Sequence, residues 1–224
     1  TSLNEKPGTG GPDFLCMRST PVEFLLEATV LKTSTVTDRT GMRSGPGGGR
    51  YDNSEGIGPI VYRKVEQKYT QISNATTEAR RPLVLSLLLN HSEAEDMLRF
   101  HGVPDIVLSP VFIPYGDGRL DYDNPAVDLK RSLFYELEPS GSLQLRRTAL
   151  SAVLLLVQDS FGVKALMIKH PGPTFELDPD VTSALSVISV VRSDAETPGF
   201  TLSFSSSDDF TEVSFQPHWQ FPAA

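Results

Sequence analysis

The sequence predicts an α/β protein with a mixed central sheet flanked by helices and additional strands in the C-terminal half. Short apolar runs rich in Val, Leu and Phe, bounded by turn residues, are typical of strands. A stripe of apolar residues at helical spacing lies between two of these runs. A later apolar run is followed at once by a hairpin partner over 162–170. We therefore expect strands at 13–17, 24–30, 83–89 and 152–157, covered by a helix over 60–74.

Composition limits the classes of protein to consider. The chain has 224 residues, of which 39% are hydrophobic, enough for one large domain with a sizeable core. The formal net charge of −8 argues against an autonomous, non-specific nucleic-acid binder, which would usually be basic. Cys16 is the single cysteine, so the chain has neither an internal disulfide nor a cysteine-based zinc site. No apolar stretch is long enough to span a bilayer, so we expect a cytoplasmic protein without a membrane partner.

The domain organisation follows from the order of these runs. We expect residues 1–175 to form the main domain and residues 176–224 to form a C-terminal extension packed on the same domain. The chain starts at Thr1 without Met, and a strand begins almost at once. We therefore expect that an N-terminal part of this domain precedes the sequence shown.

Glu27 is the anomalous residue of the second predicted strand. Side chains alternate between the two faces of a strand, so Glu27 shares its face with Leu25 and Thr29. A lone carboxylate in an apolar strand is costly unless it is paired, hydrogen-bonded or bound to a metal. Asp13 begins the preceding strand, and a hairpin-like return would bring the two acids together. Two converging carboxylates suit a hard divalent cation such as Mg²⁺.

This arrangement resembles the PD-(D/E)XK nuclease superfamily, which has the restriction-endonuclease-like fold. Pro12-Asp13 is followed, after thirteen residues, by Glu27-Ala28-Thr29. The resemblance implies a nuclease that uses Mg²⁺ or Mn²⁺ to hydrolyse phosphodiester bonds, with DNA as the nucleic-acid partner, in a bacterial defence or mobile-element system. It implies that Asp13 and Glu27 hold the metal, helped by the carbonyl or hydroxyl of Thr29. A protein partner would supply specificity.

The chain departs from the family pattern at position 29, where Thr replaces the usual Lys. It resembles a divergent E-x-T variant in which the following helix carries the lysine. Lys68 is the first candidate and Lys64 the second, because both lie on one face beside the apolar stripe. Gln71 continues that face and would orient substrate or a metal-bound water. A solvated helical face is the alternative interpretation of these three residues.

The segment 33–58 lacks hydrophobic periodicity and contains a glycine-rich stretch, which predicts a long loop. Its Arg39, Arg43 and Arg50 could contact a phosphate backbone, although solubility is an alternative explanation. The glycines do not form a phosphate-binding P-loop, since no Gly-Lys-Ser/Thr follows. We expect residues 39–53 to be mobile without a partner.

The remaining signals are weaker. Residues 92–100 predict a capped helix, and 115–124 a turn-rich surface loop. Pro104-Asp105 repeats the acid motif before a strand-like stretch over 106–113, but no second acid follows at suitable spacing. A catalytically inactive nuclease-like interaction or assembly module is the alternative function. The sequence leaves open DNA versus RNA, the sequence preference and the oligomeric state.

Overall fold

A computed structural model describes sixteen stretches of the chain, namely residues 2–3, 12–17, 23–40, 57–91, 102–108, 111–112, 115–116, 119–120, 126–127, 129, 131–140, 142–159, 162–183, 185–193, 199–205 and 210–217. In these stretches the strands are β1 (Ser2–Leu3), β2 (Phe14–Cys16), β3 (Phe24–Leu31), β4 (Leu83–Leu89), β5 (Val111–Phe112), β6 (Tyr115–Gly116), β7 (Arg119–Leu120), β8 (Ala126–Val127), β9 (Tyr135–Leu137), β10 (Leu143–Leu145), β11 (Ala152–Asp159), β12 (Gly162–Lys169), β13 (Ser186–Ser193), β14 (Gly199–Ser205) and β15 (Phe210–Pro217). The helices are α1 (Thr33–Thr40), α2 (Ile57–Ala79), α4 (Gly102–Leu108) and α5 (Pro179–Thr182).

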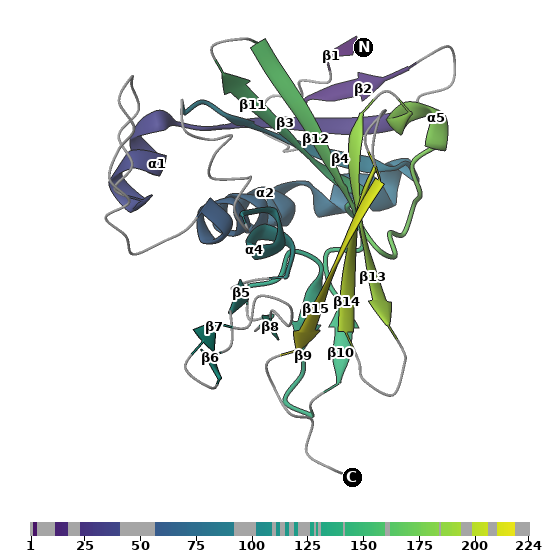
Figure 1. The fold of residues 1–224 in the computed structure, drawn as a ribbon. Coiled ribbons are helices and arrows are strands. Elements are labelled where there is room, and N and C mark those ends of the chain that lie inside the picture. Colours follow the sequence, from purple (N-terminus) through teal and green to yellow (C-terminus); the bar gives the residue numbers. More distant parts are fainter. Residues whose placement is uncertain are drawn as a thin grey trace.

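Within these stretches, eleven strands join one mixed sheet in the order β1-β2-β3-β4-β11-β12-β13-β14-β15-β8-β5. Strands β9 and β10 form a separate pair, as do β6 and β7. Helices flank the sheet, with α2 running across the strands near its middle (Figure 1). The predicted α/β class with a mixed sheet is confirmed, and so are the four predicted strands and the helix between them.

The unit β3–α2–β4 positions the candidate site. β3 and β4 pair in parallel, so the chain must cross back over the sheet between them, and α2 makes this crossover. The helix buries Val61, Val65 and Ile72, which are at most 1% exposed, against the sheet. This is the predicted apolar stripe, and it fixes which side of α2 faces β3.

The central strands of the sheet, β4 and β11, are buried or half-buried on both faces over most of their length, whereas β3 exposes Ala28 and Val30. On the α2 side, Leu25, Leu85 and Val153 belong to the main core cluster. On the opposite side, a smaller cluster includes Val84 and Ala152, covered in part by α5 and the residues before it. Because both faces are buried, the central strands are continuously apolar rather than alternating.

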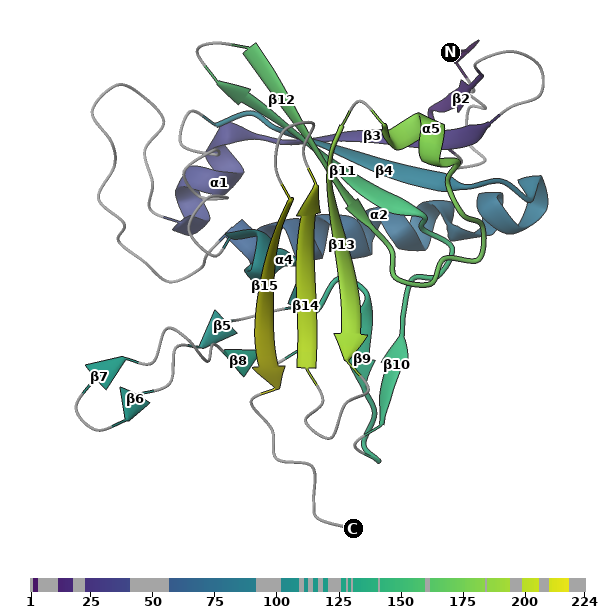
Figure 2. The same cartoon turned by 45° about the vertical axis from the view of Figure 1, so that its right-hand side comes forward.

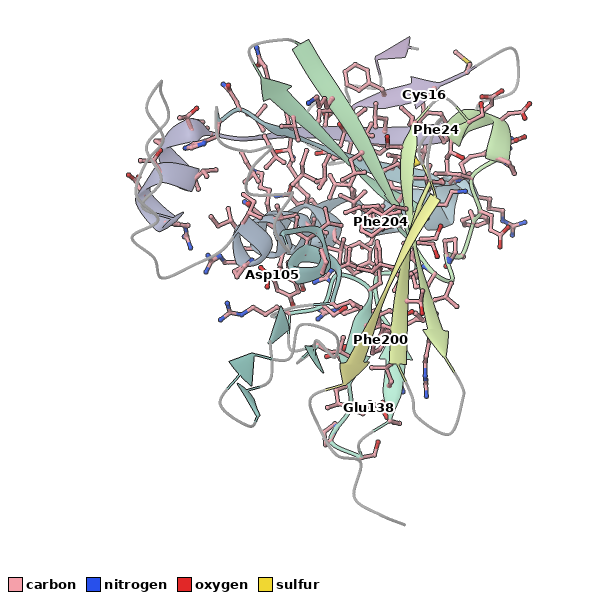
Figure 3. The ribbon with its side chains drawn as sticks, in the orientation of Figure 1. Cys16, Phe24, Asp105, Glu138, Phe200 and Phe204 are labelled. Carbon is pink, nitrogen blue, oxygen red and sulfur yellow. The ribbon has the colours of Figure 1, made fainter. Side chains whose placement is uncertain are left out.

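The sheet changes direction at the junction of β12 and β13. These two strands pair in parallel over only three residues, Leu166–Ile168 against Ser186–Ile188. Beyond this junction, β13, β14 and β15 lie at a steep angle to β3 and β4 (Figures 1 and 2). The C-terminal strands still share the main core through Ile188 and Phe200, and side chains fill the space between them and α2 (Figure 3).

Two elements differ from the sequence-based expectation. Residues 33–40 form α1 rather than the start of a long loop. Residues 102–108 form α4, whereas a strand was expected to begin at Ile106. The remainder of the predicted loop, residues 41–56, and the predicted helix over 92–100 lie outside the described residues, as does most of the segment expected to be mobile.

Both differences have a tertiary cause. The single apolar residue of α1, Val36, is fully buried, so one good contact outweighs an otherwise polar sequence. The start of α4 packs against the start of α2, where a Cβ added to Gly58 would lie 2.1 Å from an Asp105 carboxylate oxygen. Only glycine permits this approach. In the part of the chain that the structure describes, no helix is long and apolar enough to cross a membrane.

Candidate functional site

A buried ion pair joins the central strand to the crossover helix. The Lys68 ammonium donates a hydrogen bond to Glu27 Oε1 over 2.6 Å. The Glu27 side chain is only 3% exposed, and that of Lys68 is 23% exposed. Lys68, the first candidate for the lysine carried by the helix, therefore contacts Glu27 and does not extend into bulk water. The contact spans 41 positions of sequence, so only the fold could create it.

Strand register explains why Glu27 is buried there. Glu27 pairs with Leu85 of β4, and Leu85 pairs in turn with Val153 of β11. The carboxylate thus stands in a row of aliphatic side chains beneath α2. An ionised group in such a row loses its hydrogen bonds to water, and the aliphatic neighbours offer no hydrogen bonds in their place.

Asp13 reaches the same region from the neighbouring strand. The antiparallel register of β2 and β3 matches Phe14 with Leu26, so its continuation sets Asp13 opposite Glu27. One Asp13 oxygen, Oδ2, accepts a hydrogen bond of 2.9 Å from the backbone N–H of Ala28. The hairpin-like return expected from the sequence therefore brings the two acids together.

The electrostatics of Glu27 are unusual for a paired carboxylate. Burial raises the pKa of Glu27 above its ordinary value, and the negative charge of Asp13 adds to this rise. The hydrogen bond and positive charge of Lys68 act in the opposite direction, as does the backbone of Asp13, without cancelling the effect of burial. Among the described residues, Glu27 Oε2 is buried and has no hydrogen-bond partner. Glu27 therefore keeps one oxygen able to accept a further ligand.

The other predicted site residues are distributed differently. Thr29 is half-buried and lies two residues after Glu27, on the same face of β3. Gln71 is exposed on α2 and is not part of any contact with the two acids that the structure describes. Arg39 belongs to α1 rather than to a loop. Arg43 and Arg50 lie outside the described residues.

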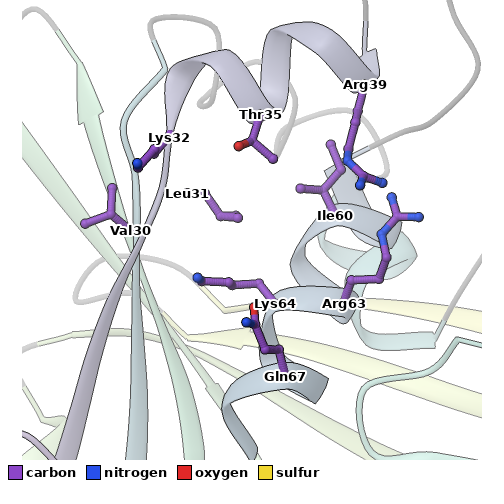
Figure 4. A pocket seen from close by; sticks show the side chains of 9 residues that line it. All are labelled: Val30, Leu31, Lys32, Thr35, Arg39, Ile60, Arg63, Lys64 and Gln67. Atoms are coloured by element: carbon purple, nitrogen blue, oxygen red, sulfur yellow. The ribbon is translucent and has the colours of Figure 1, made fainter.

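Lys64 lines a pocket and does not pair with Glu27. The pocket has a volume of about 390 Å³ and opens between α1, α2 and the end of β3 (Figure 4). Its lining consists of Val30, Leu31, Lys32, Thr35, Arg39, Ile60, Arg63, Lys64 and Gln67. Sequence reasoning missed Lys32, Arg63 and Gln67 here. Arg63 and Gln67 are one helical turn apart and flank Lys64, a spacing that could have indicated a shared face.

A second set of buried polar groups lies on the C-terminal side of α2. Arg147 pairs with Glu66, and its Nη1 donates to the Leu133 carbonyl over 2.6 Å. His170 Nε2 donates to the Arg146 carbonyl over 2.8 Å, while its Nδ1 accepts from the Gly172 N–H over 3.0 Å. His170 is therefore the neutral Nε2–H tautomer. These groups hold loops in place and leave little bonding capacity for a ligand.

Asp13 and Glu27 are the two carboxylates of the predicted metal site, and the strand register places them opposite one another. Over the stretches that the structure describes, no group of three or more His, Cys, Asp or Glu residues is positioned to hold a metal ion. A two-carboxylate site would thus depend on backbone oxygens and water for its remaining ligands.

A scan against protein-family models, a search of curated proteins and a search of solved structures each return no match to this chain.

Proposed function

We propose that this protein is a metal-dependent nuclease that uses Asp13, Glu27 and Lys68 to hydrolyse phosphodiester bonds. The observation that carries the proposal is the contact between Lys68 and Glu27, with one carboxylate oxygen left over. It supports a site of the PD-(D/E)XK kind, in which the helix supplies the lysine that position 29 lacks. A restriction-endonuclease-like fold, with DNA as substrate in a defence or mobile-element system, belongs to the same proposal.

The residues fit a divalent cation in a specific way. Buried Oε2 of Glu27 lacks a partner, and a cation beside it would lower the raised pKa of this carboxyl. Asp13 uses Oδ2 to accept from the Ala28 N–H, which orients its carboxylate. Mg²⁺ or Mn²⁺ would take oxygen ligands from these two acids, with Thr29 as a further donor. Mg²⁺ usually keeps several waters, so two carboxylates are a sufficient protein contribution.

Each residue then has a chemical task. A bound divalent cation lowers the pKa of its water and neutralises charge on the phosphate. Lys68 holds a positive charge beside Glu27, where its ammonium can donate to the attacking water or to a phosphate oxygen as negative charge develops. The aliphatic row around Glu27 keeps bulk water away and thereby strengthens these interactions. Lys64, one turn earlier on α2, would hold the substrate rather than the nucleophile.

The same ion pair also favours a second candidate function. Lys68 already neutralises Glu27 in a direct contact, which is what a nuclease-like domain without catalysis would also show. In that case the protein is an interaction or assembly module, and neither metal nor nucleic acid is required.

Cleavage of labelled single- and double-stranded DNA and RNA, with Mg²⁺ or Mn²⁺, separates the two functions. Glu27→Gln removes a metal ligand and should reduce the rate by about 10²-fold or more, and Asp13→Asn should act similarly. Glu23→Gln, at the residue that directly precedes the same strand, is the matched control and should retain wild-type activity. Wild-type protein that cleaves none of these substrates would favour the interaction module.

Thermal unfolding gives a readout that does not depend on activity. Ionised Glu27 costs the folded state stability, because its pKa is raised by burial. Glu27→Gln should therefore unfold at a higher temperature than wild type in EDTA at neutral pH. Mg²⁺ or Mn²⁺ should raise the unfolding temperature of wild type but not of Glu27→Gln. An equal metal-induced shift in both proteins would place the metal elsewhere.

A further inference from the structure

The pocket between α1, α2 and β3 concentrates positive charge in an acidic chain. Four of the nine described residues that line it are cationic, and none of the nine is acidic. The four are Lys32, Arg39, Arg63 and Lys64. The chain as a whole carries a formal charge of −8. Such a local reversal of sign raises the concentration of anionic ligands at this place.

Contacts between α1 and the rest of the fold set the shape of this pocket. α1 is anchored by Val36, which is fully buried, and by the Thr33 hydroxyl, which donates to the Asn90 carbonyl at the end of β4. Thr37 adds a 3.3 Å contact with the buried ring of His91. The pocket therefore lies at the carboxyl ends of the parallel strands β3 and β4, where α/β sheets commonly bind ligands.

Its chemistry fits a nucleotide unit better than a simple ion. Val30, Leu31 and Ile60 give the pocket an apolar part suited to a sugar or base. Arg39 and Arg63 lie close to one another on the side formed by the two helices, and Lys64 reaches from α2 toward β3 (Figure 4). Guanidinium groups match the geometry of phosphate oxygens in a bidentate manner. Thr35 and Gln67 add uncharged hydrogen-bonding groups.

The pocket is also in line with the Glu27–Lys68 pair. Leu31 follows Glu27 by four residues on the same face of β3, which corresponds to about 13 Å along the strand. Lys64 precedes Lys68 by one turn of α2, or about 6 Å. At a rise of about 3.4 Å per nucleotide, these separations correspond to roughly two to four nucleotides of one strand.

We propose that this pocket binds the phosphate backbone of a single nucleic-acid strand, two to four nucleotides from the phosphate that reacts at Glu27 and Lys68. The position along the strand rests on the proposed function, whereas the binding itself does not. Lys32, Arg39, Arg63 and Lys64 are the phosphate-contacting residues. The pocket sets which part of the strand reaches the acids.

Binding is tested with the full chain in EDTA, by fluorescence anisotropy of a labelled single-stranded DNA of about twelve nucleotides, about 40 Å long at 3.4 Å per nucleotide. The double variant Arg39→Gln/Arg63→Gln should bind at least tenfold more weakly at about 50 mM salt. Its plot of log affinity against log salt should be shallower by about 1.4, for two lost phosphate contacts. Arg39→Lys/Arg63→Lys should recover most of the affinity, which shows that charge and not folding was lost.

Arg80→Gln is the matched control. Arg80 is exposed and directly follows the last residue of α2, and its replacement removes one of the two positive charges that the double variant removes, without touching the pocket. Unchanged binding by Arg39→Gln/Arg63→Gln, or an equal loss with Arg80→Gln, would overturn the proposal. Inorganic phosphate and AMP, used as competitors, should displace the strand only weakly. Displacement by AMP at the affinity of the oligonucleotide would identify a free nucleotide as the ligand and reject a strand.

The outcome is separable from the fate of the proposed function. Glu27→Gln should bind the oligonucleotide as wild type does, because it leaves the pocket unchanged. Binding through the pocket without cleavage by any protein would reject the nuclease and keep the strand site. Cleavage with unaltered KM in Arg39→Gln/Arg63→Gln would keep the nuclease and reject the strand site.

Discussion

Two buried ion pairs on α2 have opposite construction. In the pair of Glu27 and Lys68, the acid is buried at 3% exposure and the cation is 23% exposed. In the pair of Glu66 and Arg147, the cation is buried at 1% exposure and the acid is 44% exposed. One pair joins α2 to the central sheet, and the other joins it to the loop before β11.

The two pairs also differ in what else satisfies the buried charge. Arg147 donates to the carbonyls of Leu133 and Ser132, and its guanidinium lies 4.8 Å from the centre of the Tyr62 ring. Of its donors, Nε lacks a hydrogen-bond partner among the described residues. Glu27 keeps a whole carboxylate oxygen unpartnered and has a second acid, Asp13, beside it. Buried charge is thus common to both pairs, and spare acceptor capacity next to a like charge distinguishes the pair that we propose as a functional site.

The largest expected effect is on the structural pair. Arg147→Met removes the buried guanidinium and leaves two backbone carbonyls without their donor, while Glu66 can still reach water. We expect a loss of about 2–3 kcal/mol in the free energy of unfolding, measured by urea denaturation. Arg146→Met, which removes the more exposed neighbour, should cost less than about 1 kcal/mol. Equal losses in the two variants would show that the buried contacts of Arg147 do not stabilise the fold more than those of Arg146.

A smaller effect, with a distinctive pH dependence, is expected for the other pair. Lys68→Met leaves Glu27 buried without its cation, so the pKa of Glu27, already raised by burial, should rise further. A raised pKa favours the protonated folded state, so stability is retained at low pH and is lost as the pH rises through the folded pKa. We expect a deficit of about 1–2 kcal/mol relative to wild type at about pH 8 that shrinks as the pH falls toward 4.5, the ordinary pKa of Glu27.

The deficit of Arg147→Met should not vary across the same range, since a guanidinium does not titrate there. Urea midpoints of both variants and wild type at several pH values provide the measurement. A deficit of Lys68→Met that is constant with pH would mean that Glu27 does not hold the charge assigned to it. Lys68 is expected to affect stability because its partner, Glu27, is 3% exposed.

The smallest effect concerns His170, which supports the Arg146–Arg147 turn. Burial lowers the pKa of His170 below its ordinary value of 6.5, and the charge of Arg147 acts in the same direction. A lowered pKa favours the neutral folded form, so its contribution to stability is complete above pH 6.5 and declines as the pH falls below it. NMR titration of the ring should show that the neutral Nε2–H tautomer persists below that pH. An imidazole that titrates at its ordinary value would contradict the assignment.

Much of the α/β core was predictable because its signals are local. The apolar runs of β3, β4 and β11 and the stripe of α2 each report their own burial. Glu27 was predictable because a carboxylate breaks an apolar pattern. Lys68 was predictable as well, since it borders the stripe one residue before Tyr69 and is thereby directed to the strand that carries Glu27.

The missed features depend on contacts that are distant in sequence. α1 forms because Val36 packs in the core and the Thr33 hydroxyl donates to the Asn90 carbonyl. The sequence around α1 indicates neither contact. α4 was taken for a strand because Ile106, Val107 and Leu108 are apolar in either structure, and its contact with Gly58 decides between them. The cationic pocket brings together three elements, and no single stretch of sequence contains it.

The two acids of the candidate site belong to segments of unequal local stability. Glu27 is carried by a strand of eight residues, bonded on both sides by β2 and β4. Asp13 directly precedes β2, which has three residues and is bordered by the two-residue β1. Detaching β2 breaks few contacts, so its amides should exchange with solvent by local opening, while those of β3 await global unfolding. We therefore expect the distance between the two carboxylates to fluctuate with the local opening of the shorter strand.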